Sequence, residues 1–173
     1  MCFHTKFMHM LKKAYFHTIT RMDLMHVSAI ACDSQHDFNL LKRIVPSEKL
    51  HLIPNGIEYE TLSMCDLHDR ESDLLVSVGR LAPNKRIDRL LQAFASLVAK
   101  QPDVRLAIIG PDWGMLPSLR HLSSKLGVQD RVEFLGYVTD DVLRTYLSRA
   151  NLWLSSSEYE SFGIALLEAM AAG

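Results

Sequence analysis

The chain has 173 residues, of which 48% are hydrophobic and 23% are charged, enough for one well-buried core plus part of a second domain. Lysine and arginine total 19 against 20 acidic residues, so no long-range positive field is expected to attract nucleic acid. Three widely spaced cysteines fit neither a disulfide framework nor a CxxC metal site. These features indicate a globular protein of a reducing compartment.

The first 45 residues predict a helix over 11–25, a short strand ending at Cys32, and a helix over 34–44 that Ser34 caps. The amino terminus is never apolar for long enough to form a signal peptide or a membrane span. We therefore expect a cytoplasmic protein. Lys12 and Lys13 leave open a peripheral contact with a membrane, although a solvated helix face is the simpler interpretation.

Residues 46–72 have the composition of an interdomain linker, with a short strand at 50–53 followed by a turn at Pro54, Asn55 and Gly56. From residue 73 to residue 173, short β-rich segments alternate with amphipathic helical segments. The predicted strands cover 74–79, 104–110, 132–136 and 151–157, and the predicted helices cover 87–100, 115–127, 140–150 and 164–172. This alternation predicts an α/β fold with a doubly wound, Rossmann-like parallel sheet.

In such a sheet the first and fourth strands lie side by side, and ligands bind beyond their carboxyl ends. The loop after the first strand reads GRLAPNKR, with Gly79 permitting close backbone approach and with cations at Arg80 and Lys85. The loop after the fourth strand leads into a helix whose free N–H groups would face the same crevice. This pattern predicts an anion site, most naturally for a diphosphate; the alternative is that both cations are ordinary solvated loop charges.

Two glutamates extend this prediction, because Glu160 precedes the last helix and Glu168 lies about two turns inside it. Each carboxylate accepts hydrogen bonds from two hydroxyls, which sugars supply in pairs. One glutamate would suit a hexose and the other a ribose. The alternative for Glu168 is a plain surface carboxylate, which its apolar neighbours make less attractive.

Several stretches resemble a known family: SVGRLAPNKRIDRLLQAF, IIGPDWG, DRVEFLGYV and EYESFGIALLEAMAAG. They are similar to the carboxy-terminal, nucleotide-sugar-binding domain of family 4 retaining glycosyltransferases, which have the two-domain GT-B fold. The spacing of Glu160 and Glu168 matches the E-x7-E signature of that family. Residues 26–41 and 50–58 resemble the end of the amino-terminal domain and the crossover that follows it.

The resemblance implies a role for each matching position. Arg80 and Lys85 match the basic pair that contacts the donor diphosphate, Glu160 matches the residue that holds the donor sugar, and these three are the expected catalytic residues. Glu168 matches the ribose-binding residue. Gly79, where the backbone can approach the ligand closely, is a further expected donor-binding position. Tyr137 and Val138 are expected beside the base, and Phe162, Gly163 and Ile164 near sugar and phosphate. Family members use no cofactor and need no essential metal, in line with the absence of a DxD motif.

The resemblance also implies that the chain is truncated at both ends, with residues 1–45 a remnant of the acceptor domain and residues 73–173 an incomplete donor-binding domain. Arg86 stands where the family often has a small residue. The expected activity is transfer of a hexose from a nucleotide-diphosphate sugar to an unknown acceptor with retention of configuration, the fragment itself being inactive alone. The alternatives are an epimerase or phosphorylase of the same fold, or a non-catalytic nucleotide-binding module.

Overall fold

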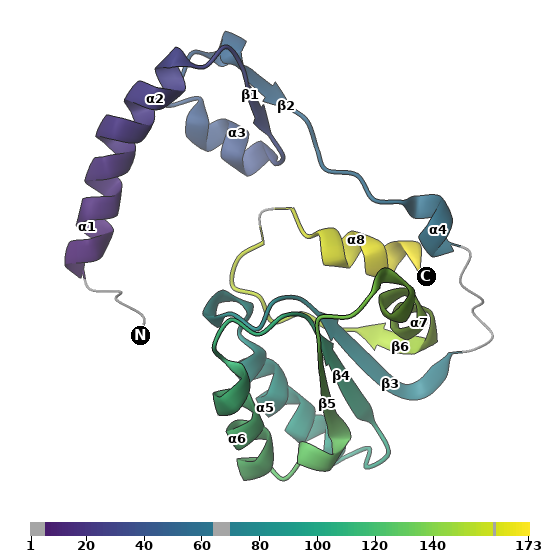
Figure 1. Cartoon of the computed structure of the whole chain (residues 1–173). Coiled ribbons are helices and arrows are strands. Elements are labelled where there is room, and N and C mark those ends of the chain that lie inside the picture. The colour runs from purple at the N-terminus through teal and green to yellow at the C-terminus, as the bar shows by residue number, and fades with distance from the viewer. Residues whose placement is uncertain (1–5, 64–69, 161) are drawn as a thin grey trace. The chain divides into compact units, whose positions relative to one another are not determined.

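A computed structural model describes residues 6–63, 70–160 and 162–173 of the chain (Figure 1). The backbone divides into two compact units, Met1–Asn55 and Gly56–Gly173. No helix of the described residues is long and apolar enough to span a membrane.

The first unit has two parallel strands and helices on either side of them in the sequence. Its strands are β1 (Ile30–Cys32) and β2 (Leu50–Leu52), and its helical elements are α1 (Lys6–Tyr15), the π-helical η1 (Phe16–Thr20), α2 (Arg21–His26), α3 (Gln35–Leu41) and the 3-10 turn η2 (Ser47–Lys49). The helix predicted over 11–25 therefore exists, with a π-helical segment in its middle. The predicted cap at Ser34 is confirmed, since its hydroxyl accepts from the N–H of Asp37 at 3.1 Å.

The second unit is built on a four-stranded parallel sheet in the order β5-β4-β3-β6. Its strands are β3 (Glu71–Val78), β4 (Arg105–Ile109), β5 (Val132–Gly136) and β6 (Ala150–Trp153). The first and fourth strands of the predicted set are indeed neighbours, because β3 pairs with both β4 and β6. The winding of the sheet reverses between β3 and β6, as the alternating pattern predicted.

Helices cover both faces of this sheet (Figure 1). The longer ones are α5 (Ile87–Val98), α6 (Leu116–Lys125), α7 (Asp140–Arg149) and α8 (Ile164–Ala171); α4 (Tyr59–Ser63) and the 3-10 turns η4 (Pro83–Lys85) and η5 (Gln129–Arg131) are short. Leu75 faces a core with Leu91 and Phe94 of α5, whereas Val76 faces a second core with Leu147 of α7. Side chains of a strand alternate between its faces, so β3 has residues in both cores.

The ends of β3 and β6 differ from the prediction. β3 begins at Glu71 instead of Leu74, because Glu71 pairs with Ala150 at the start of β6. β6 ends at Trp153 instead of residue 157. The polypeptide beyond Leu154 leaves the sheet, and the N–H of Glu158 donates to the carbonyl of Asn84 at 2.9 Å. The serine-rich end of the predicted strand is therefore a loop that contacts the loop after β3.

Candidate functional site

The carboxyl ends of β3 and β6 lie next to each other. Val76 pairs with Trp153, and the N–H of Leu154 donates to the carbonyl of Val76 at 2.7 Å. In open parallel sheets, ligands bind in the crevice beyond the strand ends where the winding reverses. The loops over residues 79–86 and 154–160, which follow these two strands, therefore form the candidate site.

The backbones at the ends of β3 and β4 approach each other closely. The N–H of Gly79 donates to the carbonyl of Ile109 at 2.8 Å. A Cβ atom on Gly110 would lie 2.1 Å from the carbonyl oxygen of Gly79, far inside van der Waals contact. Position 110 therefore requires glycine, which lets the loop after β3 start directly against the end of β4.

Lys85 and Glu160 form an ion pair that joins the two loops. The Nζ atom of Lys85 donates to Oε1 of Glu160, and Ser157 Oγ donates to the same oxygen at 2.8 Å. The Lys85 side chain is 14% exposed and lies over Gly79, with its Cε atom 3.6 Å from the position of a Cβ there. The loop after β3 thus presents its lysine to the loop after β6.

The surroundings of Glu160 favour its ionised form. Burial raises the pKa of Glu160, but hydrogen bonds from Lys85 and Ser157 and the charges of Lys85 and Arg80 outweigh burial, so the pKa lies below its usual range. Two of the three residues expected to be catalytic are therefore in contact, and the charge of the third, Arg80, acts on Glu160. At neutral pH the carboxylate is charged and able to accept hydrogen bonds from hydroxyls.

Arg80 has an aromatic partner. Its guanidinium carbon lies 4.3 Å from the centre of the Trp113 ring, which is a cation–π distance. The loop that carries Trp113 is attached to the loop after β3, because Leu81 forms a β-bridge with Asp112 and the N–H of Trp113 donates to the carbonyl of Leu81 at 3.2 Å. Trp113 itself is 60% exposed. The ring therefore limits the directions in which the Arg80 guanidinium points.

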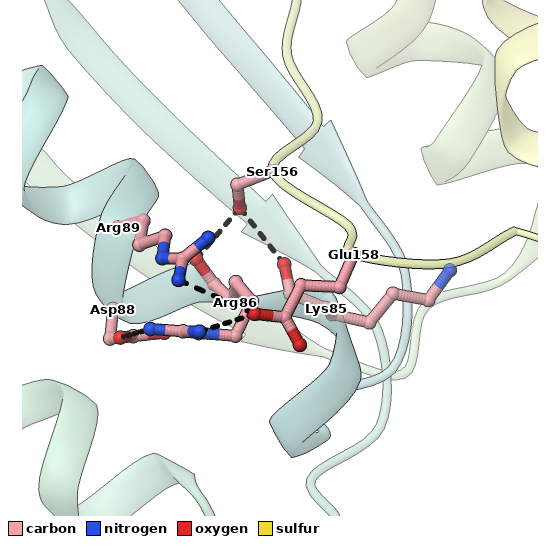
Figure 2. Close-up of polar contacts among 6 residues, drawn as sticks. All are labelled: Lys85, Arg86, Asp88, Arg89, Ser156 and Glu158. Atoms are coloured by element: carbon pink, nitrogen blue, oxygen red, sulfur yellow. Dashed lines mark hydrogen bonds and ion pairs between the residues drawn. The ribbon is translucent and has the colours of Figure 1, made fainter.

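Arg86, next to Lys85, has an unusual backbone conformation. Its φ and ψ are 48° and 41°, in the left-handed region, which costs a residue with a side chain about 1–2 kcal/mol. Figure 2 shows its guanidinium between two acids: Nε and Nη2 donate to Asp88 at 3.0 and 2.8 Å, and Nη1 donates to Glu158 at 2.5 Å. The guanidinium of Arg86 holds the pKa of the Asp88 carboxyl below its usual range, although burial opposes this effect.

Ser156 and Glu158 attach the loop after β6 to the same segment. Figure 2 shows the Ser156 hydroxyl beside two backbone carbonyl oxygens, that of Lys85 at 2.9 Å and that of Arg86 at 2.8 Å. Glu158 also lies 3.4 Å from Nη2 of Arg89. These contacts fix the backbone of Lys85 and Arg86 against the loop that carries Glu160.

Glu168 lies in a separate hollow of about 270 Å³. The residues that line it with Glu168 come from the segment around α4 and from α7 and α8: Gly56, Ile57, Glu58, Leu62, Asp140, Leu143, Arg144 and Ile164. Burial and the charge of Asp140 raise the pKa of Glu168. Lys85 and Glu160, both described by the structure, are not among the lining residues. The two glutamates of the predicted signature therefore occupy different surroundings.

The other predicted donor-binding residues flank these two places. Tyr137, just after β5, is 81% exposed, whereas Val138 packs against the core that contains Leu147. Phe162 is half-buried, and Gly163 precedes α8 with a φ of 84°. Ile164 is the first residue of α8 and shares the hollow with Glu168. The structure thus groups Ile164 with Glu168, and Gly79 and Lys85 with Glu160.

Four residues around the site were not predicted as part of it: Arg86, Asp88, Ser156 and Glu158. One signal for Arg86 existed, because it occupies a position where the resembling family often has a small residue. Glycine enters the left-handed region without strain, so an arginine with this backbone needs partners to hold it. Its partner Glu158 is 72 positions away, so no local pattern reveals the pair.

Comparisons with known proteins concern the family and the fold of the chain. The family described as Glycosyl transferases group 1 matches residues 66–173. A GDP-mannose:cellobiosyl-diphosphopolyprenol alpha-mannosyltransferase of Xanthomonas oryzae pv. oryzae is 28% identical over 99% of this chain and 45% of its own length. The solved structure of WaaG, a glycosyltransferase involved in lipopolysaccharide biosynthesis, matches with a TM-score of 0.71 at 24% identity, over 98% of this chain and 50% of WaaG.

A third match is the crystal structure of Anabaena HepE in complex with UDP and glucose, with a TM-score of 0.70 and 23% identity over 84% of this chain and 42% of HepE. The family match covers more than half of the chain. The chain therefore belongs to the group 1 glycosyl transferases, also called family 4, and has the α/β architecture of GT-B glycosyltransferases. It spans about 45% of the length of the curated relatives that it matches along nearly its whole sequence.

Proposed function

We propose that this chain supplies the donor site of a retaining glycosyltransferase that transfers a hexose from a nucleotide-diphosphate sugar to an acceptor. The observation that carries the proposal is the contact of Lys85 with Glu160 at the point where the sheet reverses its winding. A cation and a carboxylate in contact at this point provide one group for a phosphate and one for the hydroxyls of the sugar next to it. A sugar diphosphate requires both of these groups, the cation and the carboxylate.

Arg80 and Lys85 are the proposed partners of the diphosphate. In the unliganded chain Lys85 is neutralised by Glu160, so a bound phosphate would take over a hydrogen bond of the ammonium. The first N–H groups of α8 add a positive dipole end beyond Gly163. As the bond from sugar to diphosphate breaks, charge builds up on the leaving diphosphate, and cations already fixed in place stabilise that charge.

The two glutamates are the proposed partners of the two sugars. Glu160 would accept hydrogen bonds from hydroxyls of the transferred hexose, for which its low pKa keeps it ionised. Glu168 would accept hydrogen bonds from the two hydroxyls of the ribose in the hollow beside α8. Tyr137 and Val138, which follow β5, would flank the base, and Phe162 would adjoin the sugar.

The acceptor would be bound largely by residues of an amino-terminal acceptor domain. Residues 1–45 would be a part of that domain, and residues 46–72 would connect the two. We expect the reaction to take place in the cytoplasm, at a membrane surface if the acceptor is a lipid. GDP-mannose, named for the Xanthomonas relative, and UDP with glucose, named for HepE, define the first donors to test.

The first experiment is calorimetric titration of the chain with UDP, GDP, UDP-glucose and GDP-mannose. The proposal expects one nucleotide diphosphate to bind and its sugar-bearing form to bind more tightly, with the added affinity lost in Glu160→Gln. Absence of binding by all four compounds to the folded chain would contradict the proposal. An assay of the longer protein with the labelled donor then separates transfer from epimerisation, from phosphate-dependent cleavage and from binding alone.

A further inference from the structure

The contacts around Arg86 point to a role for that residue beyond stability. We propose that Arg86 is a positioning residue, which together with Asp88, Glu158 and Ser156 holds Lys85 and Glu160 in contact before the donor binds. This inference rests on the proposed function, because the contact matters for the donor. It concerns the geometry of the site, and Arg86 itself touches neither phosphate nor sugar in this account.

The network lies directly beside the pair that it would position. Asn84, Lys85 and Arg86 each make a backbone or side-chain contact with the loop after β6, through Glu158 and Ser156. Glu160 follows Glu158 by two residues and contacts Lys85 in turn. Three consecutive residues of the loop after β3 therefore contact the loop after β6. The contacts of Arg86 adjoin the contact of Lys85 with Glu160.

The backbone conformation of Arg86 indicates that the side-chain contacts of this residue hold the two loops together. Among the described residues it alone, apart from glycines, has a positive φ. The side chain is fixed on both sides, with two hydrogen bonds to Asp88 within its own loop and one to Glu158 across the gap. A planar guanidinium with donors in fixed directions suits such a bridge, whereas the ammonium of a lysine is a compact point charge without that fixed geometry.

Stability alone would be a weak reason for this network. The side chains of Arg86, Asp88 and Glu158 are 26%, 34% and 50% exposed, and ion pairs of partly exposed groups contribute little to folding. Displacement of Lys85 or Glu160 would affect the site more strongly, because the strength of a charge-assisted hydrogen bond depends steeply on distance and direction. Loss of Arg86 should therefore change the site more than it changes the melting temperature.

A direct test needs no ligand. The pKa of Glu160 is measured by NMR on the ¹³C-glutamate-labelled chain, in the wild type and in Arg86→Ala and Glu158→Gln. We expect this pKa to rise toward the usual value of about 4.3 in both variants, because the Lys85–Glu160 contact loosens. An unchanged pKa of Glu160 in both variants, with the fold retained, would overturn the proposal.

The matched control is Arg105→Ala. Arg105 also bridges two acids, Glu71 and Asp73, but it begins β4 and so lies at the opposite end of the strands from the site. The control should leave the pKa of Glu160 unchanged. A shift equal to that of Arg86→Ala would indicate a general effect of charge or stability, and would also contradict the positioning role.

Binding provides the second measurement, with GDP and UDP as probes. We expect Arg86→Ala to weaken the better probe about tenfold, Arg86→Lys to recover part of the loss, and Arg86→Ala to add little once Lys85 is already alanine. Equal binding by the wild type and Arg86→Ala, with loss in Lys85→Ala, would contradict the positioning role while leaving the donor site intact. If the wild type binds neither these probes nor UDP-glucose and GDP-mannose, the proposed function fails, and the pKa measurement still decides whether Arg86 orders the pair.

Discussion

Lys85 and Glu160 are 75 positions apart in the sequence and form an ion pair at the carboxyl ends of β3 and β6. The pair has a consequence for binding, because each member must exchange part of this contact for a contact with a ligand. The ammonium would turn to a phosphate and the carboxylate to a hydroxyl. Substitutions at the two positions should therefore have different effects on different parts of the same ligand.

Replacing Lys85 by alanine removes the less exposed of the two cations that are proposed to contact the diphosphate. We expect binding of the nucleotide diphosphate to weaken by about 1–3 kcal/mol, the range for hydrogen bonds to charged groups. Arg80→Ala should weaken binding by a similar amount. Titration calorimetry measures both, and Lys100→Ala, which removes an exposed lysine beyond the end of α5, is the matched control. Unchanged affinity in Lys85→Ala would exclude this lysine from the phosphate site.

Replacing Glu160 by glutamine should distinguish binding of the sugar from binding of the nucleotide. The variant loses the carboxylate that would accept sugar hydroxyls, and it also releases Lys85 from its ion pair. We therefore expect the sugar nucleotide to bind at least about tenfold more weakly, as for the loss of one charged hydrogen-bond acceptor. Binding of the bare nucleotide diphosphate should be unchanged or tighter. Equal losses for both ligands would argue against contact of Glu160 with the sugar.

Glu168 should oppose folding at neutral pH. Burial and the charge of Asp140 raise its pKa in the folded chain, so the folded state holds its proton to a higher pH than the unfolded state does. By linkage, the stability of the folded chain falls as pH rises through the interval between the unfolded and the folded pKa of this group. Glu168→Gln should therefore raise the melting temperature at pH 7, and the gain should vanish below about pH 4.

The same variant should weaken nucleotide binding, because an amide replaces a carboxylate facing the ribose hydroxyls. Asp130→Asn, a substitution of an exposed carboxyl at η5, serves as the control for a plain change of charge. A gain in melting temperature that persists unchanged at low pH would show that the burial of a charged Glu168 is not its cause. Unaltered nucleotide affinity would remove Glu168 from the proposed site.

Gly110→Ala should destabilise the chain more than a glycine substitution elsewhere. The new Cβ would lie 2.1 Å from the carbonyl oxygen of Gly79, so the end of β4 or the loop after β3 must move. We expect a loss of about 3 kcal/mol, at the upper end for inserting an atom into a packed region. The control Gly127→Ala has a φ of 70° but no neighbour within 4 Å, and should lose only about 1–2 kcal/mol. Urea unfolding of both variants compares these losses.

The fold was largely predictable because its elements carry local signals. The alternation of β-rich segments with helical periods located the four strands of the second unit, and the usual order of a doubly wound sheet placed the first beside the fourth. The boundaries were less certain, and the length of β6 was wrong. Its serines continue the strand pattern, but hydrogen bonds from Ser156 and Glu158 to the loop after β3 draw the chain away from the sheet.

The site was predictable only in part. Arg80, Lys85 and Glu160 were singled out by residue type and by spacing in a resembling family, and the structure places Lys85 against Glu160. The network around Arg86 could not be found in this way, because the pairing of Arg86 with Glu158 depends on how two distant loops meet. The hollow around Glu168 likewise depends on α4 approaching α8.

The most direct measurement is a crystal structure of the chain with the sugar nucleotide that calorimetry identifies. We expect the diphosphate to contact Arg80, Lys85 and the N–H groups at the start of α8. We expect the hexose at Glu160 and the ribose at Glu168. A ligand bound elsewhere on the folded chain, or a diphosphate that leaves the ion pair of Lys85 and Glu160 undisturbed, would contradict the proposed donor site.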